Sequence, residues 1–456
     1  MKIAIVFGKG LDGCGVEKYG YEWKRYDPDN IDIFNLVERS FVRSGGHIKE
    51  SISFKPSEML DVAKRLNDNY DIVILNSYPS PMHKRETIKS FYYDLVLQIK
   101  KPILVSMMHE IKRMNYDRIP IHLAISNAAD IIFNFSTETT YSQDMAGILT
   151  NKKLGERIAR MKLPITVSDY EEYRIPFKDK NKSCIYASRW TSMKHPSRLI
   201  DLWEMDKDFH YAIHGIERSI GAKFDIIDRT EYQAKFNGYT YYAGRELMES
   251  FGPYEYQEGM NLIANSMFGY SGYALPKERH NYGDRFEYAQ MEIIAVGTVP
   301  IFDIDYGLYN NAENGKAFSD HDIAIWSDRN DLENTKEQIH RISKDESAYN
   351  RYLDAGIEFL KIETDASNII PPMLEHITKV GKQTDKWDHD TFLDNVYNTD
   401  VKEHFNYVME NHIPALGAKE VMNQTISYFE KKKRIVYKSK QELKDDGQIS
   451  LEDFFT

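Results

Sequence analysis

The chain has 456 residues, of which 42% are hydrophobic, so it is long enough to bury the cores of two or three domains. It has no apolar run of bilayer-spanning length, and its two cysteines, Cys14 and Cys184, stand far apart. These features argue against a membrane-spanning protein and a disulfide framework, and we expect a soluble protein of a reducing compartment. The net charge of −11 argues mildly against a chain wrapped in nucleic acid, but it is compatible with a local basic face.

The N-terminal sequence MKIAIVFG predicts a first β-strand over residues 2–7. It does not indicate a signal peptide, because glycines follow the short apolar run and no small-residue cleavage site does. Residues 8–20 form a glycine-containing loop before a predicted helix, and in α/β folds such a loop turns backbone N–H groups toward a phosphate or a substrate. The glycines match neither the dinucleotide fingerprint nor the loop that binds nucleoside triphosphates.

Apolar strands alternate with helices through the first part of the chain. We expect helices at 56–67 and 85–99, and strands at 71–76, 102–107 and 130–135. This alternation predicts a doubly wound parallel sheet, in which ligands bind beyond the carboxyl ends of the strands. The polar pairs Asn76-Ser77 and His109-Glu110 follow two of these strands and are therefore candidate site residues.

A second α/β alternation begins after Pro176, with strands expected at 183–187, 211–214, 298–302 and 323–326. Residues 334–359 follow as a long amphipathic helical region. We therefore expect one α/β domain over 1–178, a second over 179–365, a helical extension over 366–430, and a basic tether with a C-terminal tail over 431–456. The strand ends of the two α/β domains would face each other across a central cleft.

Charged side chains follow the strands of the second domain. Arg189 and Lys194 suit a diphosphate, because arginine binds it as a fork and lysine as a point charge. Glu217 and Arg218 follow the next strand. Glu287 and Glu292 lie on a helix that Gly297 ends, and their carboxylates can accept hydrogen bonds from the vicinal hydroxyls of a sugar. Together these residues predict a sugar-nucleotide site, whereas the glutamates taken alone would indicate a solvated helix surface.

A basic segment at 151–162 contains four residues that could contact DNA phosphates, namely Lys152, Lys153, Arg157 and Arg160. A solvated helix explains the same composition about as well. The sequence Asp303-Ile304-Asp305 has the spacing of a metal-binding Asp-x-Asp motif. We predict no metal there, because cations and helix dipoles can neutralise a diphosphate without one.

These segments together resemble the DNA alpha-glucosyltransferase family of T-even phages. The resemblance rests on GLDGCGVEKY at 10–19, Asn76-Ser77, His109-Glu110, the Arg189/Lys194 pair, GIERS at 215–219, FEYAQMEIIAVGTVPIF at 286–302 and SDHDIAIWSDRNDLENT at 319–335. It covers about residues 1–362. It implies a GT-B fold of two Rossmann-like domains with parallel sheets that face a central cleft. It also implies that the second domain binds a uridine diphosphate (UDP) sugar and the first binds DNA.

The resemblance also assigns roles to residues. The donor-binding set becomes Gly13, Cys14, Gly15, Val16, Arg189, Lys194, Glu217, Arg218, Glu287 and Glu292. His109 and Glu110 become the catalytic pair, although the family has His-Asp there. The longer carboxylate of Glu110 would steady charge at the anomeric carbon or help to take the acceptor proton. Retention of configuration implies front-face transfer, in which the leaving phosphate helps to deprotonate a 5-hydroxymethylcytosine flipped out of duplex DNA.

The C-terminal sequence QISLEDFF lies outside the resemblance and has the pattern Q-x-x-L-x-x-F-F, formed by Gln448, Leu451, Phe454 and Phe455. It resembles the peptides that dock on sliding clamps, in which a leucine and two aromatic residues enter an apolar groove. The basic segment before it would act as a tether that lets the tail reach the clamp. A C-terminal segment that packs on its own domain would explain the same pattern.

The leading hypothesis is a phage enzyme that uses a UDP-sugar donor, without a metal, to glycosylate double-stranded DNA containing 5-hydroxymethylcytosine. Such an enzyme would act in the cytoplasm of the infected bacterial host and protect phage DNA from nucleases. Glucose is the favoured sugar, and a pentose such as arabinose is the main rival to it. Two further hypotheses are a GT-B enzyme with a polysaccharide or small-molecule acceptor, and a clamp-bound DNA-binding module without activity.

Overall fold

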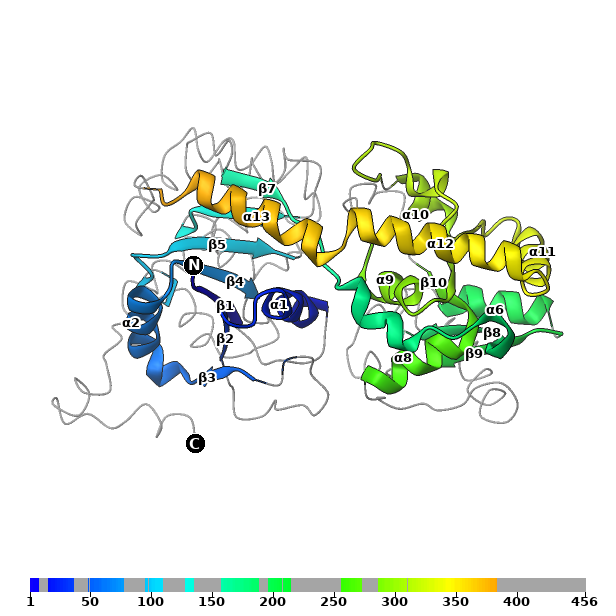
Figure 1. The fold of residues 1–456 in the computed structure, drawn as a ribbon, viewed down its shortest axis with the longest axis horizontal. Coiled ribbons are helices and arrows are strands. Elements are labelled where there is room, and N and C mark those ends of the chain that lie inside the picture. Colours follow the sequence, from blue (N-terminus) through cyan, green and yellow to red (C-terminus); the bar gives the residue numbers. More distant parts are fainter. Residues whose placement is uncertain are drawn as a thin grey trace, which may run out of the picture. The chain divides into compact units, whose positions relative to one another are not determined.

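The computed structural model describes residues 1–7, 15–36, 48, 50–77, 95–96, 98–109, 128–134, 157–187, 196–206, 208–214, 256–272, 286–309 and 311–383. Contacts divide the chain into two compact units, which are labelled by element in Figure 1. Unit 1 consists of Met1–Met161 and Ile370–Thr456, and unit 2 consists of Lys162–Ile369. Within the described parts, no helix is long and apolar enough to cross a membrane.

Unit 1 contains a parallel sheet in the order β3-β2-β1-β4-β5-β6-β7. Its strands are β1 (Ile3–Phe7), β2 (Ile31–Leu36), β3 (Ile52–Phe54), β4 (Ile72–Ser77), β5 (Ile103–Met108), β6 (Ile131–Asn134) and β7 (Ile158–Arg160). The strands are almost wholly apolar because both faces of the sheet are covered. The strand order reverses direction between β1 and β4, and ligands in doubly wound sheets bind at such a switch point.

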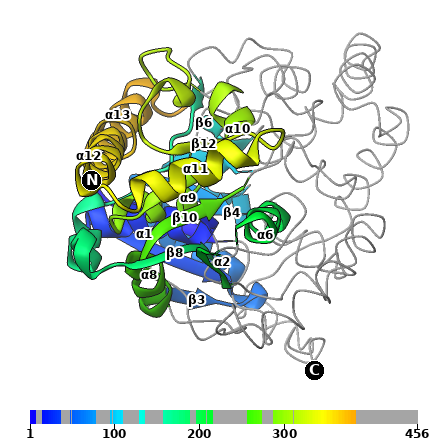
Figure 2. The same ribbon diagram turned by 90° about the vertical axis from the view of Figure 1, so that its right-hand side faces the viewer.

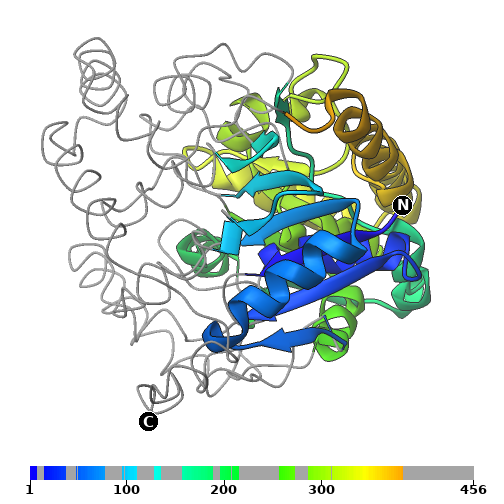
Figure 3. The same cartoon turned by 90° about the vertical axis from the view of Figure 1, so that its left-hand side faces the viewer.

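Helices α1 (Gly15–Tyr26) and α13 (Ala366–Val380) cover one face of this sheet. Tyr19 of α1 reaches the sulfur atoms of both Met107 in β5 and Met373 in α13, and Phe133 of β6 packs edge-on against His376. Figures 1 and 2 show α13 in orange. Helix α2 (Met59–Asn69) follows a short 3-10 turn, η1 (Pro56–Glu58), and covers the opposite face, where Figure 3 shows it in front of the strands.

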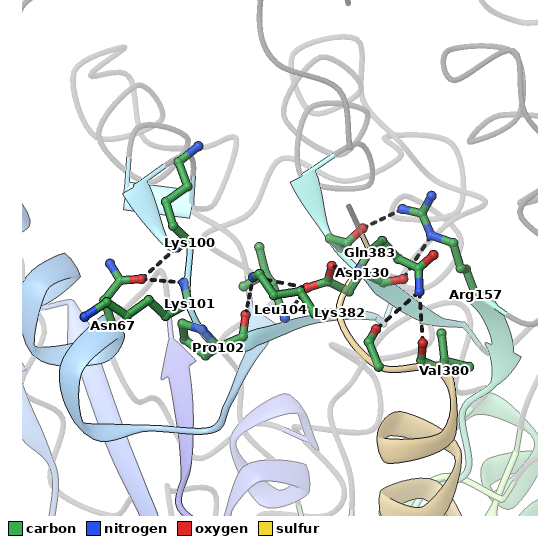
Figure 4. Close-up of polar contacts among 12 residues, drawn as sticks. Asn67, Lys100, Lys101, Pro102, Leu104, Asp130, Arg157, Val380, Lys382 and Gln383 are labelled. Atoms are coloured by element: carbon green, nitrogen blue, oxygen red, sulfur yellow. Dashed lines mark hydrogen bonds and ion pairs between the residues drawn. The ribbon is translucent and has the colours of Figure 1, made fainter. Parts of the chain in front are cut away.

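The end of α13 is tied to unit 1 by a buried carboxylate, Asp130 (Figure 4). Its two oxygens accept hydrogen bonds from the backbone N–H groups of Leu104, at 2.7 Å, and Gln383, at 2.8 Å. The Nζ atom of Lys382 donates to the carbonyl of Pro102 at 2.7 Å, and burial lowers the pKa of Lys382. The residues that follow α13 are therefore bonded to the early strands of unit 1, far from them in sequence.

Unit 2 contains a five-stranded parallel sheet in the order β12-β11-β10-β8-β9. Its strands are β8 (Asn181–Ala187), β9 (His210–His214), β10 (Ser266–Ser271), β11 (Val299–Asp303) and β12 (Ile325–Ser327). Its main helices are α6 (Pro196–Met205), α8 (Tyr256–Asn265), α9 (Tyr288–Ala295), α10 (Ile304–Tyr309), α11 (Leu332–Ile342) and α12 (Glu346–Glu363). The described part of this unit also contains the short 3-10 segments η3 (Val167–Tyr173), η4 (Phe177–Asp179) and η8 (Phe318–Asp320).

Alternation along β10 assigns the helices of unit 2 to opposite faces of its sheet. Phe268 and Tyr270 join the core formed with α6 and α11, and Figure 2 shows α11 in yellow in front of β12. Gly269, between them in sequence, faces Ile293 of α9. On its other side α9 meets α12, where Gly356 faces Ile294. Helix α9 is therefore enclosed, and seven of its eight residues are buried.

The contacts between elements divide the chain at different positions from the boundaries predicted at 178/179 and 365/366. Residues from Lys162 onward already belong to unit 2, because Ile165 exchanges backbone hydrogen bonds with Thr364 and Ala366, and η3 packs against α9. Helix α13 begins at Ala366 but packs on the sheet of unit 1. Hydrogen bonds and packing therefore join segments that the sequence pattern had placed in different domains.

Most predicted elements in the described regions lie within about two residues of their expected positions. The predicted helical region at 334–359 is two helices, α11 and α12, because the Asp345 side chain accepts from the Ala348 N–H and begins a new helix there. Strands β2, β3, β7 and β10 were not predicted, and β7 lies in the basic segment for which a solvated helix was the alternative. The predicted helix at 85–99 lies mostly outside the described residues.

The close approach of α9 to β10 can be tested by adding one methyl group. A Cβ atom at Gly269 would lie 2.6 Å from Cγ2 of Ile293, so Gly269→Ala should lower the free energy of unfolding by about 1–3 kcal/mol. Ile293→Ala should partly relieve this clash. Denaturant unfolding of both single variants and the double variant measures the coupling, and additive losses would show that the two residues are not in steric contact.

Candidate functional site

Three strand ends of unit 1 bring polar residues to the switch point of its sheet. Strand β1 leads toward Gly15 and Val16, which begin α1. Strand β4 ends with Asn76 and Ser77, and His109 directly follows β5. Since β1, β4 and β5 are neighbours in the sheet, these residues meet at one edge. The described residues of the three predicted strand ends therefore lie close together.

Asn76 joins two of the predicted site residues. Its side chain is fully buried, its Nδ2 donates to the carbonyl of Val16 at 2.8 Å, and its Oδ1 lies 2.9 Å from Nε2 of His109. The ring of His109 also packs edge-on against Tyr19, with the ring centroids 5.1 Å apart. Burial raises the pKa of Tyr19, so its hydroxyl stays neutral. His109 is thus oriented by both a hydrogen bond and an aromatic contact.

Of the four predicted DNA contacts, two lie on or next to β7. Arg157 is buried, and its guanidinium donates to the carbonyls of Ala129 at 2.7 Å and Asp130 at 3.0 Å (Figure 4). These bonds join β7 to the start of β6, so they indicate that Arg157 has a structural role and does not present its charge to a phosphate. Arg160 is partly exposed on β7. Lys152 and Lys153 lie outside the described residues.

In unit 2, helix α9 carries both predicted carboxylates. Glu287 is the residue before the helix, where its carbonyl accepts from Gln290 and Met291 and its N–H donates to Oε1 of Gln290 at 2.9 Å. Glu292 lies within the helix and is only 9% exposed. Gly269 of β10 packs against Ile293 in this helix, so the sheet contacts α9 directly.

Two tyrosines surround the buried carboxylate of Glu292. The hydroxyl of Tyr256, from α8, donates to Oε1 of Glu292 at 2.6 Å, and the hydroxyl of Tyr170, from η3, lies 2.7 Å from that of Tyr256 and 3.5 Å from the same oxygen. Burial, and then the charge of Glu292, raises the pKa of Tyr256 well above its ordinary value. The tyrosine therefore remains a neutral donor that fixes the orientation of the carboxylate.

The other end of α9 is held just as closely. Gly297 adopts φ +81°, which ends the helix as predicted. The Nε of Arg174 donates to the carbonyl of Ala295 at 3.0 Å, and a cation there suits the negative end of the helix dipole. The hydroxyl of Tyr349 donates to the carbonyls of Met267, at 2.8 Å, and Gly297, at 3.3 Å. Both ends of the helix are therefore fixed to neighbouring segments.

Several predicted residues lie outside the described parts of the chain, so their positions remain predictions. These are Gly13, Cys14, Glu110, Arg189, Lys194, Glu217, Arg218, Gln448, Leu451, Phe454 and Phe455. The described strand β8 ends at Ala187, shortly before Arg189, and it lies at the switch point of the sheet of unit 2.

Within the described residues, no group of three or more His, Cys, Asp or Glu side chains could hold a metal ion. Asp303, of the Asp-x-Asp sequence, is buried at the end of β11, where the hydroxyl of Tyr270 donates to its Oδ1 at 3.4 Å. Asp305 lies on the next helix, α10. The described surroundings of Asp303 are those of a buried strand end.

Comparison with known families matches residues 231–347 to the family described as DNA alpha-glucosyltransferase. The chain is also 26% identical over 417 residues to the DNA alpha-glucosyltransferase of Enterobacteria phage T4, a match that covers 83% of this chain and 100% of that protein. The chain is a relative of the DNA alpha-glucosyltransferases. The matched segment 231–347 contains α9 and the strands on either side of it.

Solved structures confirm the GT-B fold of this DNA alpha-glucosyltransferase relative. An alpha-glucosyltransferase in complex with UDP and a 13-mer DNA containing a HMU base has a TM-score of 0.69 at 23% identity, covering 83% of this chain and 99% of that chain. Anabaena Alr3699/HepE in complex with UDP and glucose has a TM-score of 0.55 at 12% identity, with the same two coverages. With this fold and the relationship to the phage T4 protein, the chain is a glycosyltransferase of the GT-B class.

Two residues beside Glu292, Tyr170 and Tyr256, were not predicted as site residues, and Asn76 was predicted without a role. Asn76 was noted as a strand-end residue, and its position after an apolar strand was the available signal. Tyr170 and Tyr256 were missed because they come from η3 and α8, far from Glu292 in sequence, and the chain has 31 tyrosines that any pattern must distinguish.

The Tyr256–Glu292 bond can be tested with a single hydroxyl deletion. Tyr256→Phe leaves a buried carboxylate with one donor fewer, so we expect the free energy of unfolding to fall by about 1–3 kcal/mol. Tyr352→Phe is the matched control, because the hydroxyl of this buried tyrosine forms no hydrogen bond with any described residue. Denaturant unfolding should show little change in the control, and equal losses in the two variants would contradict the interpretation.

Proposed function

We propose that the chain transfers a sugar from a UDP-sugar to 5-hydroxymethylcytosine in duplex DNA, with retention of configuration and with glucose as the sugar. The relationship to the phage T4 enzyme supports the reaction type, and the relatives solved with UDP and with DNA support the donor and acceptor classes. Such modification would act in the cytoplasm of an infected bacterium and protect phage DNA from host nucleases.

The main support for the proposed donor site is the carboxylate of Glu292, which neighbouring tyrosines hold in one orientation. A carboxylate buried this deeply is costly unless it is hydrogen-bonded, and here Tyr256 supplies a 2.6 Å bond to one of its oxygens. A carboxylate can accept several hydrogen bonds, so it can serve tyrosine hydroxyls and the ribose hydroxyls of a nucleotide together. Glu287, before the first turn of the same helix, would lie nearer the sugar or the diphosphate. Arg189 and Lys194 would neutralise the diphosphate.

His109 carries the chemical step in this proposal. It lies at the switch point of the sheet of unit 1, where its ring is held by Asn76 and Tyr19. Glu110 follows it and would steady charge at the anomeric carbon or help to remove the acceptor proton. In a front-face reaction, the departing diphosphate oxygen itself takes part in deprotonating the hydroxymethyl group. The base must leave the helix to reach this position.

One experiment separates glucose transfer from the competing hypotheses. The protein is incubated with duplex DNA containing 5-hydroxymethylcytosine and a panel of UDP-sugars, and the nucleosides are then weighed by mass spectrometry. A hexose increment with UDP-glucose is the expected result. A pentose increment with UDP-arabinose would instead support arabinose transfer, and no increment with any donor would indicate a non-DNA acceptor or a module without activity.

The donor site is tested by substituting Glu292. Glu292→Ala should weaken UDP-sugar binding at least tenfold, because about 1.4 kcal/mol corresponds to tenfold and a charged hydrogen bond contributes more than that. Glu258→Gln, on the exposed part of α8, is the control and should bind the donor normally. Calorimetric titration with UDP measures both variants, and DNA affinity should not change. Donor affinity equal to that of the native protein in Glu292→Ala would refute the proposed site.

We further propose that the C-terminal sequence docks on a sliding clamp. Its support is the pattern formed by Gln448, Leu451, Phe454 and Phe455, which lie outside the described residues. Deletion of 447–456 should abolish clamp binding, because it removes all four anchors, and should leave sugar transfer to short duplexes intact. Surface plasmon resonance against the immobilised phage clamp measures the first effect. Equal clamp affinity with and without the tail would exclude this docking.

A further inference from the structure

Asn76 stands at an irregularity of the sheet in unit 1. Strands β1 and β4 pair in regular parallel register up to Val6 with Leu75, and the next pair is Phe7 with Ser77. Asn76 is thus the extra residue of a β-bulge. Such bulges re-aim a side chain and recur beside functional sites. Here the result is a buried amide directed at His109 and at the first turn of α1.

The space for this amide is made by a second feature, Gly20 of α1. A Cβ atom at Gly20 would lie 2.5 Å from Cζ of Phe7 and 3.2 Å from Nδ2 of Asn76. The absence of a side chain at this position lets the helix approach the bulge closely enough for the amide to reach the carbonyl of Val16. The bulge, Gly20 and the side-chain amide of Asn76 therefore act together to position that amide.

The carbonyl of Val16 fixes which way the amide points. A carbonyl oxygen can only accept a hydrogen bond, so the atom of Asn76 that lies 2.8 Å from it must be the NH₂ group. The opposite atom, Oδ1, can only accept as well. The hydrogen between Oδ1 and Nε2 of His109, 2.9 Å apart, must therefore belong to the histidine.

We propose that Asn76 is a positioning residue that holds His109 in the tautomer protonated at Nε2. In the neutral ring Nδ1 is then the acceptor nitrogen, so His109 takes up a proton at Nδ1. The inference deepens the proposed function, since it rests on His109 acting in the transfer reaction. It assigns a defined chemical task to a fully buried residue, which acts through His109.

The tautomer can be measured without any activity. Nitrogen-15 NMR of protein labelled at histidine distinguishes the protonated from the unprotonated ring nitrogen, and His109→Gln identifies the signals of His109 among the 14 histidines. The native protein should show Nε2 protonated and Nδ1 unprotonated at high pH. The reverse pattern would overturn the proposal whether or not the protein transfers a sugar. The expected pattern together with no sugar transfer would confirm the tautomer that Asn76 imposes and would refute the proposed function.

Substitutions of Asn76 then link the tautomer to the reaction. Asn76→Ala should give a mixture of tautomers and lower kcat at least about tenfold, with the KM for the UDP-sugar nearly unchanged. Asn76→Asp keeps an acceptor for Nε2–H, so it should retain the native tautomer. Its negative charge should move the histidine limb of the kcat–pH profile to higher pH.

Asn67→Ala is the control for the loss of another asparagine in the same unit that both donates and accepts hydrogen bonds. Asn67 donates to the carbonyls of Ala63 and Gln98, and accepts from the N–H groups of Lys100 and Lys101, at the opposite edge of the sheet (Figure 4). This variant should lose stability and keep the native tautomer and pH profile. If Asn76→Ala behaved in the same way as Asn67→Ala, Asn76 would be structural only and the proposal would fail.

Discussion

The enclosure of helix α9 is the constraint on which the rest of unit 2 depends. This helix has only eight residues and almost no exposed surface, so its position is determined by packing and not by its own helix propensity. Gly269 and Gly356 let a strand and a helix approach it from two sides, which leaves little freedom for sliding. A carboxylate on such a helix is held as rigidly as a core residue, and Glu292 gains an orientation that an exposed glutamate would lack.

The two units orient their polar groups by different means. In unit 2, close packing fixes the backbone of α9, and tyrosine hydroxyls then direct the carboxylate of Glu292. In unit 1, an irregular strand pairing directs Asn76, and hydrogen bonds then direct His109. Both arrangements satisfy a buried polar group fully enough to offset the cost of removing it from water. Each therefore needs a partner from a distant part of the chain.

Periodicity and strand-end chemistry were sufficient to predict two parallel α/β units, to place His109 at the end of a strand and to place Glu292 on a helix before a buried strand. The short strand β3 was missed because three residues carry little periodicity, and its stability comes from pairing with β2. The bulge at Asn76 could not be predicted, because register depends on the partner strand. Arg157 matched a phosphate-binding pattern by composition, yet its bonds to two carbonyls arise only when β6 and β7 are side by side.

The bond between Asp130 and Gln383 has a consequence for the order in which the molecule is made. Synthesis proceeds from the N-terminus, and domains generally fold as units during it. Unit 1 contains the first strands to leave the ribosome, but α13 and the amide of Gln383 follow only after all of unit 2. Until then Asp130 lacks the backbone donor that Gln383 supplies, and one face of the sheet lacks α13. The first unit to be synthesised is therefore the last to be completed.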